Sequence, residues 1–190
     1  MTVKYVNCKG DAYYLHQGKT RTGKPKYFFS RKKDGILVEK IPDGYEIYEN
    51  PNAQVFLRKI PPKIFTDEEI SVVKDGVKNV SKLKDFKIDV KGNQIIIFLP
   101  NQDVDSLEEI FSDFLGCNNP GLNQLLKTSL TYSPMMRFVL TDERDREFQV
   151  ERMCFLGSID NWIYLGGGDL KKLVKRYCPH LGKESFFELI

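Results

Sequence analysis

The sequence predicts an α+β fold built from antiparallel β-hairpins and three to four helices. Short runs of β-branched and aromatic residues recur in pairs, separated by glycine, asparagine or proline, which is typical of hairpins. Between these pairs lie segments whose apolar residues recur at helical spacing. Hairpins followed by helices favour α+β over a doubly wound α/β fold, because parallel βαβ units alternate single strands with helices.

The first sixty residues are predicted to be mostly antiparallel β. The opening hairpin is interrupted by Gly18, Gly23 and Pro25, residues that suit turns. A turn at Pro42–Gly44 separates this hairpin from a second one. The expected strands are 3–7, two strands carrying Tyr13–Leu15 and Tyr27–Phe29, then 36–41, 45–48 and 54–58.

A proline-rich connector, Ile60–Lys63, marks the expected boundary between two parts of the chain, because each proline disfavours helix in the residue before it. We predict a basic β-rich region over 1–63 and an α+β region over 64–190; a single continuous domain is the alternative. The charge changes near the same place. Residues 1–66 hold 13 Lys and Arg against 6 Asp and Glu, whereas the remainder holds 16 against 20.

A helix is predicted immediately after the connector. Thr66 and Glu69 have the spacing of a capping box, and three acidic residues in the first turn suit the helix dipole. The helix is expected to run from Asp67 to about Asn79, with Gly76 weakening it.

The C-terminal part repeats the succession of hairpins and helices. Asp169 is the expected N-cap of the last helix. The remaining expected elements are a hairpin over 86–90 and 95–99, a helix over 107–115, a helical turn over 122–126, a hairpin over 136–140 and 148–155, a strand over 162–165 and a helix over 170–177.

Composition excludes several classes of protein. The chain is 41% hydrophobic and 29% charged, as globular proteins are, and no apolar run approaches the roughly 18 residues of a membrane span. The N-terminus lacks an apolar signal core, so we expect a cytoplasmic protein that does not enter a membrane. The four cysteines are scattered without a C-x-x-C pair, and we expect free thiols and no cofactor.

The strongest functional signal is a run of cations in the first hairpin. No acidic residue lies between Lys19 and Lys33, and aromatic residues flank the run. Cations beside exposed rings can bind nucleic-acid phosphates and stack on bases. The alternative is that the rings enter the core while the cations keep the strands soluble. The candidate nucleic-acid-binding residues are Lys19, Arg21, Lys24, Lys26, Arg31, Lys32, Lys33, Tyr14 and Tyr27.

Three other constellations carry weaker signals. The glycines at 166–168 precede a helix but lack a phosphate-loop motif, so a turn and cap explain them better. Cys178 and His180 are the closest pair of metal-ligand types, yet two more ligands would be needed. The charged stretch 141–147 interleaves acids with arginines, as an exposed hairpin connection does. We therefore assign no catalytic, cofactor-binding or metal-binding residue.

Trp162, the only tryptophan, is the candidate interaction residue, because tryptophan often anchors interfaces; packing of its ring in the core is the favoured alternative. The preferred function is a non-enzymatic binding module that contacts nucleic acid or another polyanion through the basic hairpin. The first alternative is a module that binds a protein partner or forms a homodimer. The second alternative is an enzyme of an unfamiliar type, which would show a pocket with converging polar groups.

Overall fold

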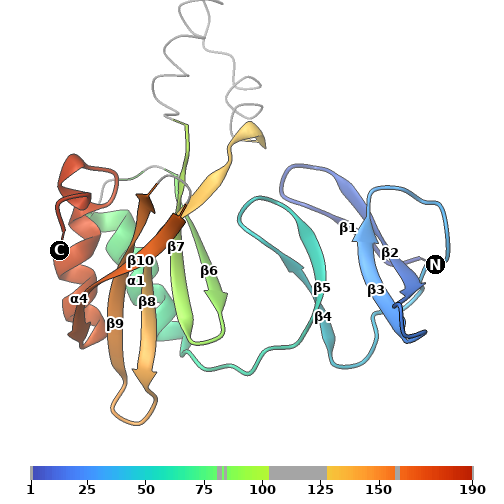
Figure 1. Ribbon diagram of the computed structural model, residues 1–190, viewed down its shortest axis with the longest axis horizontal. Coiled ribbons are helices and arrows are strands. Elements are labelled where there is room, and N and C mark those ends of the chain that lie inside the picture. Colours follow the sequence, from blue (N-terminus) through green and yellow to red (C-terminus); the bar gives the residue numbers. More distant parts are fainter. Residues whose placement is uncertain (1, 81–82, 84, 103–127, 157–158, 190) are drawn as a thin grey trace, which may run out of the picture. The chain divides into compact units, whose positions relative to one another are not determined.

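A computed structural model describes residues 2–80, 83, 85–102, 128–156 and 159–189. The chain divides into two compact units, Met1–Pro61 with Val104–Leu130 and Pro62–Asp103 with Thr131–Ile190. The division between Pro61 and Pro62 lies inside the proline-rich connector. Each unit has its own sheets (Figure 1). The predicted division into regions 1–63 and 64–190, with a single continuous domain as its alternative, stays a prediction.

The first unit contains a three-stranded antiparallel sheet in the order β1-β2-β3. Its strands are β1 (Lys4–Val6), β2 (Ala12–Lys19) and β3 (Pro25–Ser30). Strand β2 is paired along both edges. β3 lies on one edge, while β1 and then residues 36–38 lie on the other, with backbone bonds from Gln17 to Ile36 and from Val38 to Leu15. Leu15 is fully buried.

A second hairpin, β4 (Tyr45–Glu49) and β5 (Val55–Lys59), completes the first unit. β5 packs against β3. The turn after β1 is tied to this hairpin, because the Asn7 side chain donates to the Ala53 carbonyl over 2.8 Å. The Tyr5 hydroxyl likewise donates to Glu49 over 2.9 Å, and this bond raises the pKa of Tyr5.

The second unit is built on a five-stranded antiparallel sheet in the order β10-β9-β8-β7-β6. Its strands are β6 (Lys87–Lys91), β7 (Gln94–Pro100), β8 (Tyr132–Asp142), β9 (Glu147–Leu156) and β10 (Ile159–Gly168). Because side chains alternate between faces, one face gathers the apolar core and the other stays polar and aromatic. The core face includes Ile95, Ile97, Phe138, Phe148 and Val150.

Two helices, α1 (Asp67–Val80) and α4 (Leu170–Tyr177), pack on the core face and contact each other (Figure 1). The predicted capping box opens α1: the Thr66 amide donates to the Glu69 carboxylate, and the Glu69 amide donates to the Thr66 hydroxyl. Glu69 also pairs with Arg146 from the β8–β9 turn, which raises the pKa of Arg146. One acid thus caps the helix and attaches it to the sheet.

The start of α4 is fixed by the strand before it. Asp169 caps the helix as predicted, accepting a hydrogen bond from the Lys172 amide over 3.1 Å. A bulge in β10 between Tyr164 and Gly166 leaves the Leu165 carbonyl free to accept from the buried Tyr177 hydroxyl over 2.7 Å. A Cβ atom on Gly166 would lie 2.8 Å from that hydroxyl oxygen, so glycine permits the contact.

The predicted fold class is wrong in its helix content. Strands make up 44% of the described residues and helices 19%, and these residues contain two α-helices where three to four were expected. The structure is therefore mostly β, with three sheets, and fits α+β only loosely. The helix expected over 107–115 and the turn over 122–126 lie outside the described residues.

Two local predictions are also wrong. Residues 36–41 do not form the predicted strand: pairing with β2 is limited to an isolated bridge from Leu37 to His16 and the flanking backbone bonds of Ile36 and Val38. The glycines at 166–168, expected in a turn, extend β10 and pair with β9. Among the described residues, no helix is long and apolar enough to cross a membrane.

We predict that Gly76→Ala destabilises the protein, although alanine favours helix. A Cβ atom at this position would lie 2.0 Å from Val174 Cγ1 of α4, so the helices must separate. Overpacking costs about 1–3 kcal/mol, against a gain of about 1 kcal/mol in helix propensity. The melting temperature should fall by about 2–4 °C for each kcal/mol lost.

Ser71→Ala is the matched control, because Ser71 lies on the exposed side of the same helix. It should leave the melting temperature unchanged or raise it slightly. A Gly76→Ala protein as stable as Ser71→Ala would show that the helices do not approach so closely.

Candidate nucleic-acid interface

The candidate site is the basic ribbon, which we define as residues 12–33: β2, β3, the turn between them and the cations that follow. The turn is ordered by its own hydrogen bonds. The Thr20 amide donates to the Lys24 carbonyl over 2.8 Å, and the Lys24 amide donates to the Thr20 hydroxyl over 3.1 Å. Gly23 adopts φ +79°, which glycine tolerates without strain. Residues 19–26 are all exposed, so the cations of the turn face solvent.

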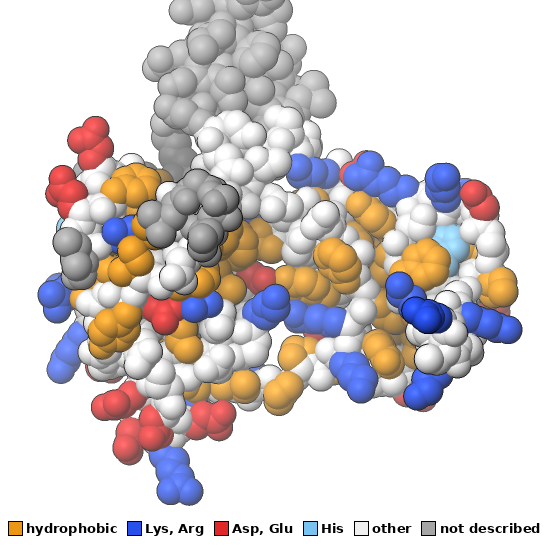
Figure 2. All heavy atoms as spheres, in the orientation of Figure 1, with side chains coloured by type: hydrophobic (Ala, Val, Ile, Leu, Met, Phe, Trp, Pro, Cys, Tyr) orange, Lys and Arg blue, Asp and Glu red, His pale blue; other side chains and the backbone are white. Residues whose placement is uncertain are grey.

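All seven predicted cations of the basic ribbon are exposed, and Lys and Arg side chains gather around the turn in Figure 2. Two of them have local partners. Arg31 donates to Asp11 over 2.7 Å, and Lys33 Nζ lies 5.1 Å from the centroid of the Tyr14 ring. The other five form no ion pair with any described residue: Lys19, Arg21, Lys24, Lys26 and Lys32. Their charge is not neutralised locally.

Arg31 is held at the base of the basic ribbon by three groups. Its Nε donates to the Tyr13 hydroxyl over 3.3 Å, and its guanidinium also lies over the Tyr13 ring. The bond to Tyr13 raises the pKa of Arg31, with a further contribution from the Asp11 charge. Arg31 therefore shapes the base of the basic ribbon and is less available to a ligand than the cations of the turn.

The predicted aromatic residues lie on opposite faces of the basic ribbon. Strand alternation places Tyr14 with His16 and Phe28, whereas Tyr27 shares a face with the fully buried Leu15. Tyr14 and Tyr27 are both half-buried. The most exposed ring belongs to Phe28, with 42% of its surface accessible, and the sequence did not single it out among its aromatic neighbours. Strand register would have separated these faces, but the sequence does not fix that register.

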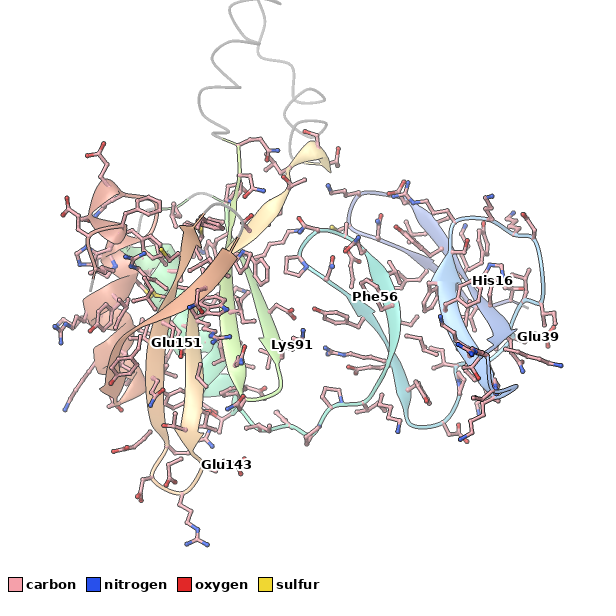
Figure 3. All side chains as sticks on the ribbon, viewed as in Figure 1. His16, Glu39, Phe56, Lys91, Glu143 and Glu151 are labelled. Atoms are coloured by element: carbon pink, nitrogen blue, oxygen red, sulfur yellow. The ribbon has the colours of Figure 1, made fainter. Side chains whose placement is uncertain are left out.

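His16, labelled in Figure 3, is buried with 4% of its surface exposed, and its ring packs against that of Phe28. The two rings are stacked, with centroids 5.4 Å apart and planes 13° apart. A ring nitrogen, Nε2, lies 2.9 Å from the Lys32 carbonyl oxygen, and Nδ1 faces Gly35. His16 thus joins the two strands to the loop that follows them.

The other candidate constellations have structural explanations. Cys178 is fully buried, and burial raises the pKa of its thiol to about 12, so the thiolate that a metal needs is disfavoured. His180 Nδ1 lies 2.9 Å from the Ser185 hydroxyl. Asp142 in the charged turn accepts hydrogen bonds from the Asp145 and Arg144 amides, which lower its pKa.

Trp162 lies on the sheet face that α1 and α4 leave uncovered. It is half-buried, and the Arg137 guanidinium carbon lies 4.2 Å from the centroid of its ring. Arg137 also pairs over 2.5 Å with Glu151, which is labelled in Figure 3. Two more exposed rings, Phe155 and Tyr164, share the face.

Comparison with known proteins gives no match: no family model, no curated protein and no solved structure corresponds to the chain. The function must therefore be argued from the charges and rings of the chain itself.

The buried thiol makes a prediction about pH. Because the pKa of Cys178 is raised from 9.0 to about 12, the folded protein keeps the thiol neutral while the unfolded chain ionises it. This contribution to stability is complete below pH 9 and is lost as the pH rises toward 12. In denaturant titrations, the free energy of unfolding of the unaltered protein should fall with rising pH more steeply than that of Cys178→Ala. The difference should reach about 1.4 kcal/mol per pH unit.

The comparison isolates the thiol, because tyrosines and lysines titrate equally in both proteins. Parallel pH curves for the two proteins would mean that Cys178 is accessible to solvent and that the end of α4 packs differently.

Proposed function

We propose that the protein is a non-enzymatic cytoplasmic module that binds nucleic acid or another polyanion through the basic ribbon. The observation that carries the proposal is a group of five exposed cations that form no ion pair with any residue the structure describes: Lys19, Arg21, Lys24, Lys26 and Lys32. Phosphates are the natural partners of such a group, because binding releases the counterions condensed on a polyanion.

The arrangement of these cations supports binding more than simple solubility. Lysines that only protect a sheet edge would be spread along an unpaired strand. Here four of the five lie within the eight residues around one ordered turn, and no acidic side chain occurs between Lys19 and Lys33. A concentrated positive potential attracts a polyanion and speeds its association.

We predict that a variant with four lysines changed to alanine loses salt-sensitive polyanion binding but keeps its fold. The four lysines are Lys24, Lys26, Lys32 and Lys33. The measurement is fluorescence anisotropy with labelled DNA and RNA at about 50 and 200 mM salt. If each lysine meets one phosphate, the four lysines account for about 3 units of the slope of log affinity against log salt in the unaltered protein. Loss of the Lys33 contact with Tyr14 should cost at most about 1 kcal/mol of stability.

The matched control removes the same charge from the second unit. Lys171, Lys172, Lys175 and Lys183 are exposed and lie in or just after α4. Their replacement by alanine should lower affinity little. Equal losses in the two variants would show that net charge alone governs binding, and unchanged affinity in the first variant would exclude the basic ribbon.

A second candidate function is self-association through the open face of the second unit. Tyr164 is 56% exposed and Phe155 48% exposed, and both lie beside Trp162. The Arg137–Glu151 pair at this face neutralises itself, so two copies can approach without like-charge repulsion. This arrangement favours a homodimer over a charged protein partner.

For this candidate we predict that Tyr164→Lys keeps the protein monomeric at concentrations where the unaltered chain dimerises. A lysine on each copy would place like charges in the interface and expose less apolar surface. Sedimentation velocity over a wide concentration range checks it, with Phe187→Lys as the control at another exposed ring. A constant monomer mass for the unaltered protein would eliminate this candidate.

A further inference from the structure

One face of the basic ribbon carries a ring that is positioned for stacking. Because β2 and β3 pair in register, His16 lies opposite Phe28 and Gly18 lies opposite Lys26. These residues therefore share a face with Tyr14, two residues before His16. The face combines one exposed aromatic ring, a glycine and a cation.

The ring of Phe28 is packed against groups of the basic ribbon on one side. It covers His16 in a nearly parallel stack, and a Cβ atom on Gly18 would lie 3.4 Å from Phe28 Cε1. One side of the ring is thus occupied by the protein. With 42% of the residue exposed, the opposite side is accessible to a ligand.

The support beneath Phe28 is rigid. His16 is buried, contacts the Lys32 carbonyl, and belongs to a strand that is hydrogen-bonded along both edges. A ring that is already ordered loses little conformational entropy when a ligand covers it. Phe56 of β5 is equally exposed, at 46%, and stacks on Tyr48, but Arg58 there is paired with Glu46. Of these two rings, only Phe28 lies near cations that form no ion pair with a described residue.

Cations flank the Phe28 ring along the direction of β3. Lys26 precedes it by two residues on the same face, a separation of about 6.6 Å along a strand. Lys32 follows the strand, and its exposed side chain forms no ion pair within the described part of the chain. A nucleic-acid backbone that runs along β3 therefore meets a cation on each side of a base stacked on Phe28.

Such a platform suits unpaired bases. In a duplex, both faces of a base are covered by its neighbours, and proteins reach only the edges in the grooves. In a single strand the bases can turn outward and stack on aromatic side chains, with cations on the backbone. A ring held in place by its stack with His16 cannot enter a base stack without opening that stack.

We propose that the ligand of the basic ribbon is single-stranded nucleic acid, with one base stacked on Phe28 and the flanking phosphates bound by Lys26 and Lys32. This inference rests on the proposed polyanion binding and names its ligand class. Sequence preference is weak in such a site, because every base has a face that can stack.

The test compares Phe28→Leu with Phe56→Leu, each in the full-length chain. Leucine keeps an apolar contact with the residue beneath but removes the aromatic face. Anisotropy is measured with a labelled oligothymidine, a hairpin duplex of the same phosphate count, and heparin as a polyanion without bases. The unaltered protein should prefer the single strand, and Phe28→Leu should weaken that binding about tenfold while heparin binding is unchanged.

Phe56→Leu should bind all three probes as the unaltered protein does. Circular dichroism and thermal melting establish that each variant is folded. If Phe28→Leu does not fold, ultraviolet cross-linking of the unaltered protein to oligothymidine replaces it, and the cross-linked peptide should contain Phe28.

The outcomes separate the two proposals. The single-strand inference would be overturned if the protein bound single strand and duplex equally and Phe28→Leu had no effect. A cross-link outside the Phe28 peptide would overturn it as well. Either result would leave polyanion binding in place. Failure of the unaltered protein to bind any probe, heparin included, would overturn both.

Discussion

The pairing of β2 along both of its edges is the constraint on which the candidate site depends. β3 occupies one edge, and β1 with residues 36–38 occupies the other. This arrangement buries Leu15 on one face and His16 on the other, although they are neighbours in sequence. An isolated two-stranded hairpin is marginally stable in water, so the additional strand and loop are what make the basic ribbon a fixed surface.

Fixing the basic ribbon determines which of its groups can act on a ligand. Arg31 is engaged by Asp11 and Tyr13, and Lys33 lies over Tyr14, so these two cations also stabilise the fold. The cations nearer the turn make no comparable contacts with other described side chains of the first unit. The basic ribbon therefore has a structural base and a positively charged end. Because the cations that would bind a ligand are not those that hold the fold, the fold stays stable when no ligand is bound.

The sequence predicted local elements well where a single local mechanism decides them. The Thr66 capping box, the Asp169 N-cap and the hairpins around Gly92 and Arg146 follow from residues within a few positions of each other. It failed where distant contacts decide. Gly76 weakens an isolated helix, yet its missing side chain lets Val174 of α4 approach, and Gly166 similarly admits the Tyr177 hydroxyl.

The candidate site is likewise only partly predictable from local sequence. The charge of the basic ribbon is visible in the sequence, because no acidic residue interrupts it. Which aromatic ring reaches solvent is not, because that depends on the register between β2 and β3: Tyr27 shares a face with the buried Leu15, and Phe28 lies on the opposite face. A one-residue shift in register would exchange these two rings.

The most direct test of polyanion binding is to locate the contact by NMR, following backbone amide shifts during titration with an oligonucleotide. We predict that the largest changes fall in residues 14–33, with the amides of Lys24, Lys26, Tyr27 and Phe28 among them, and that the five-stranded sheet is unaffected. Changes concentrated around Trp162 and Tyr164, with none in the basic ribbon, would contradict it.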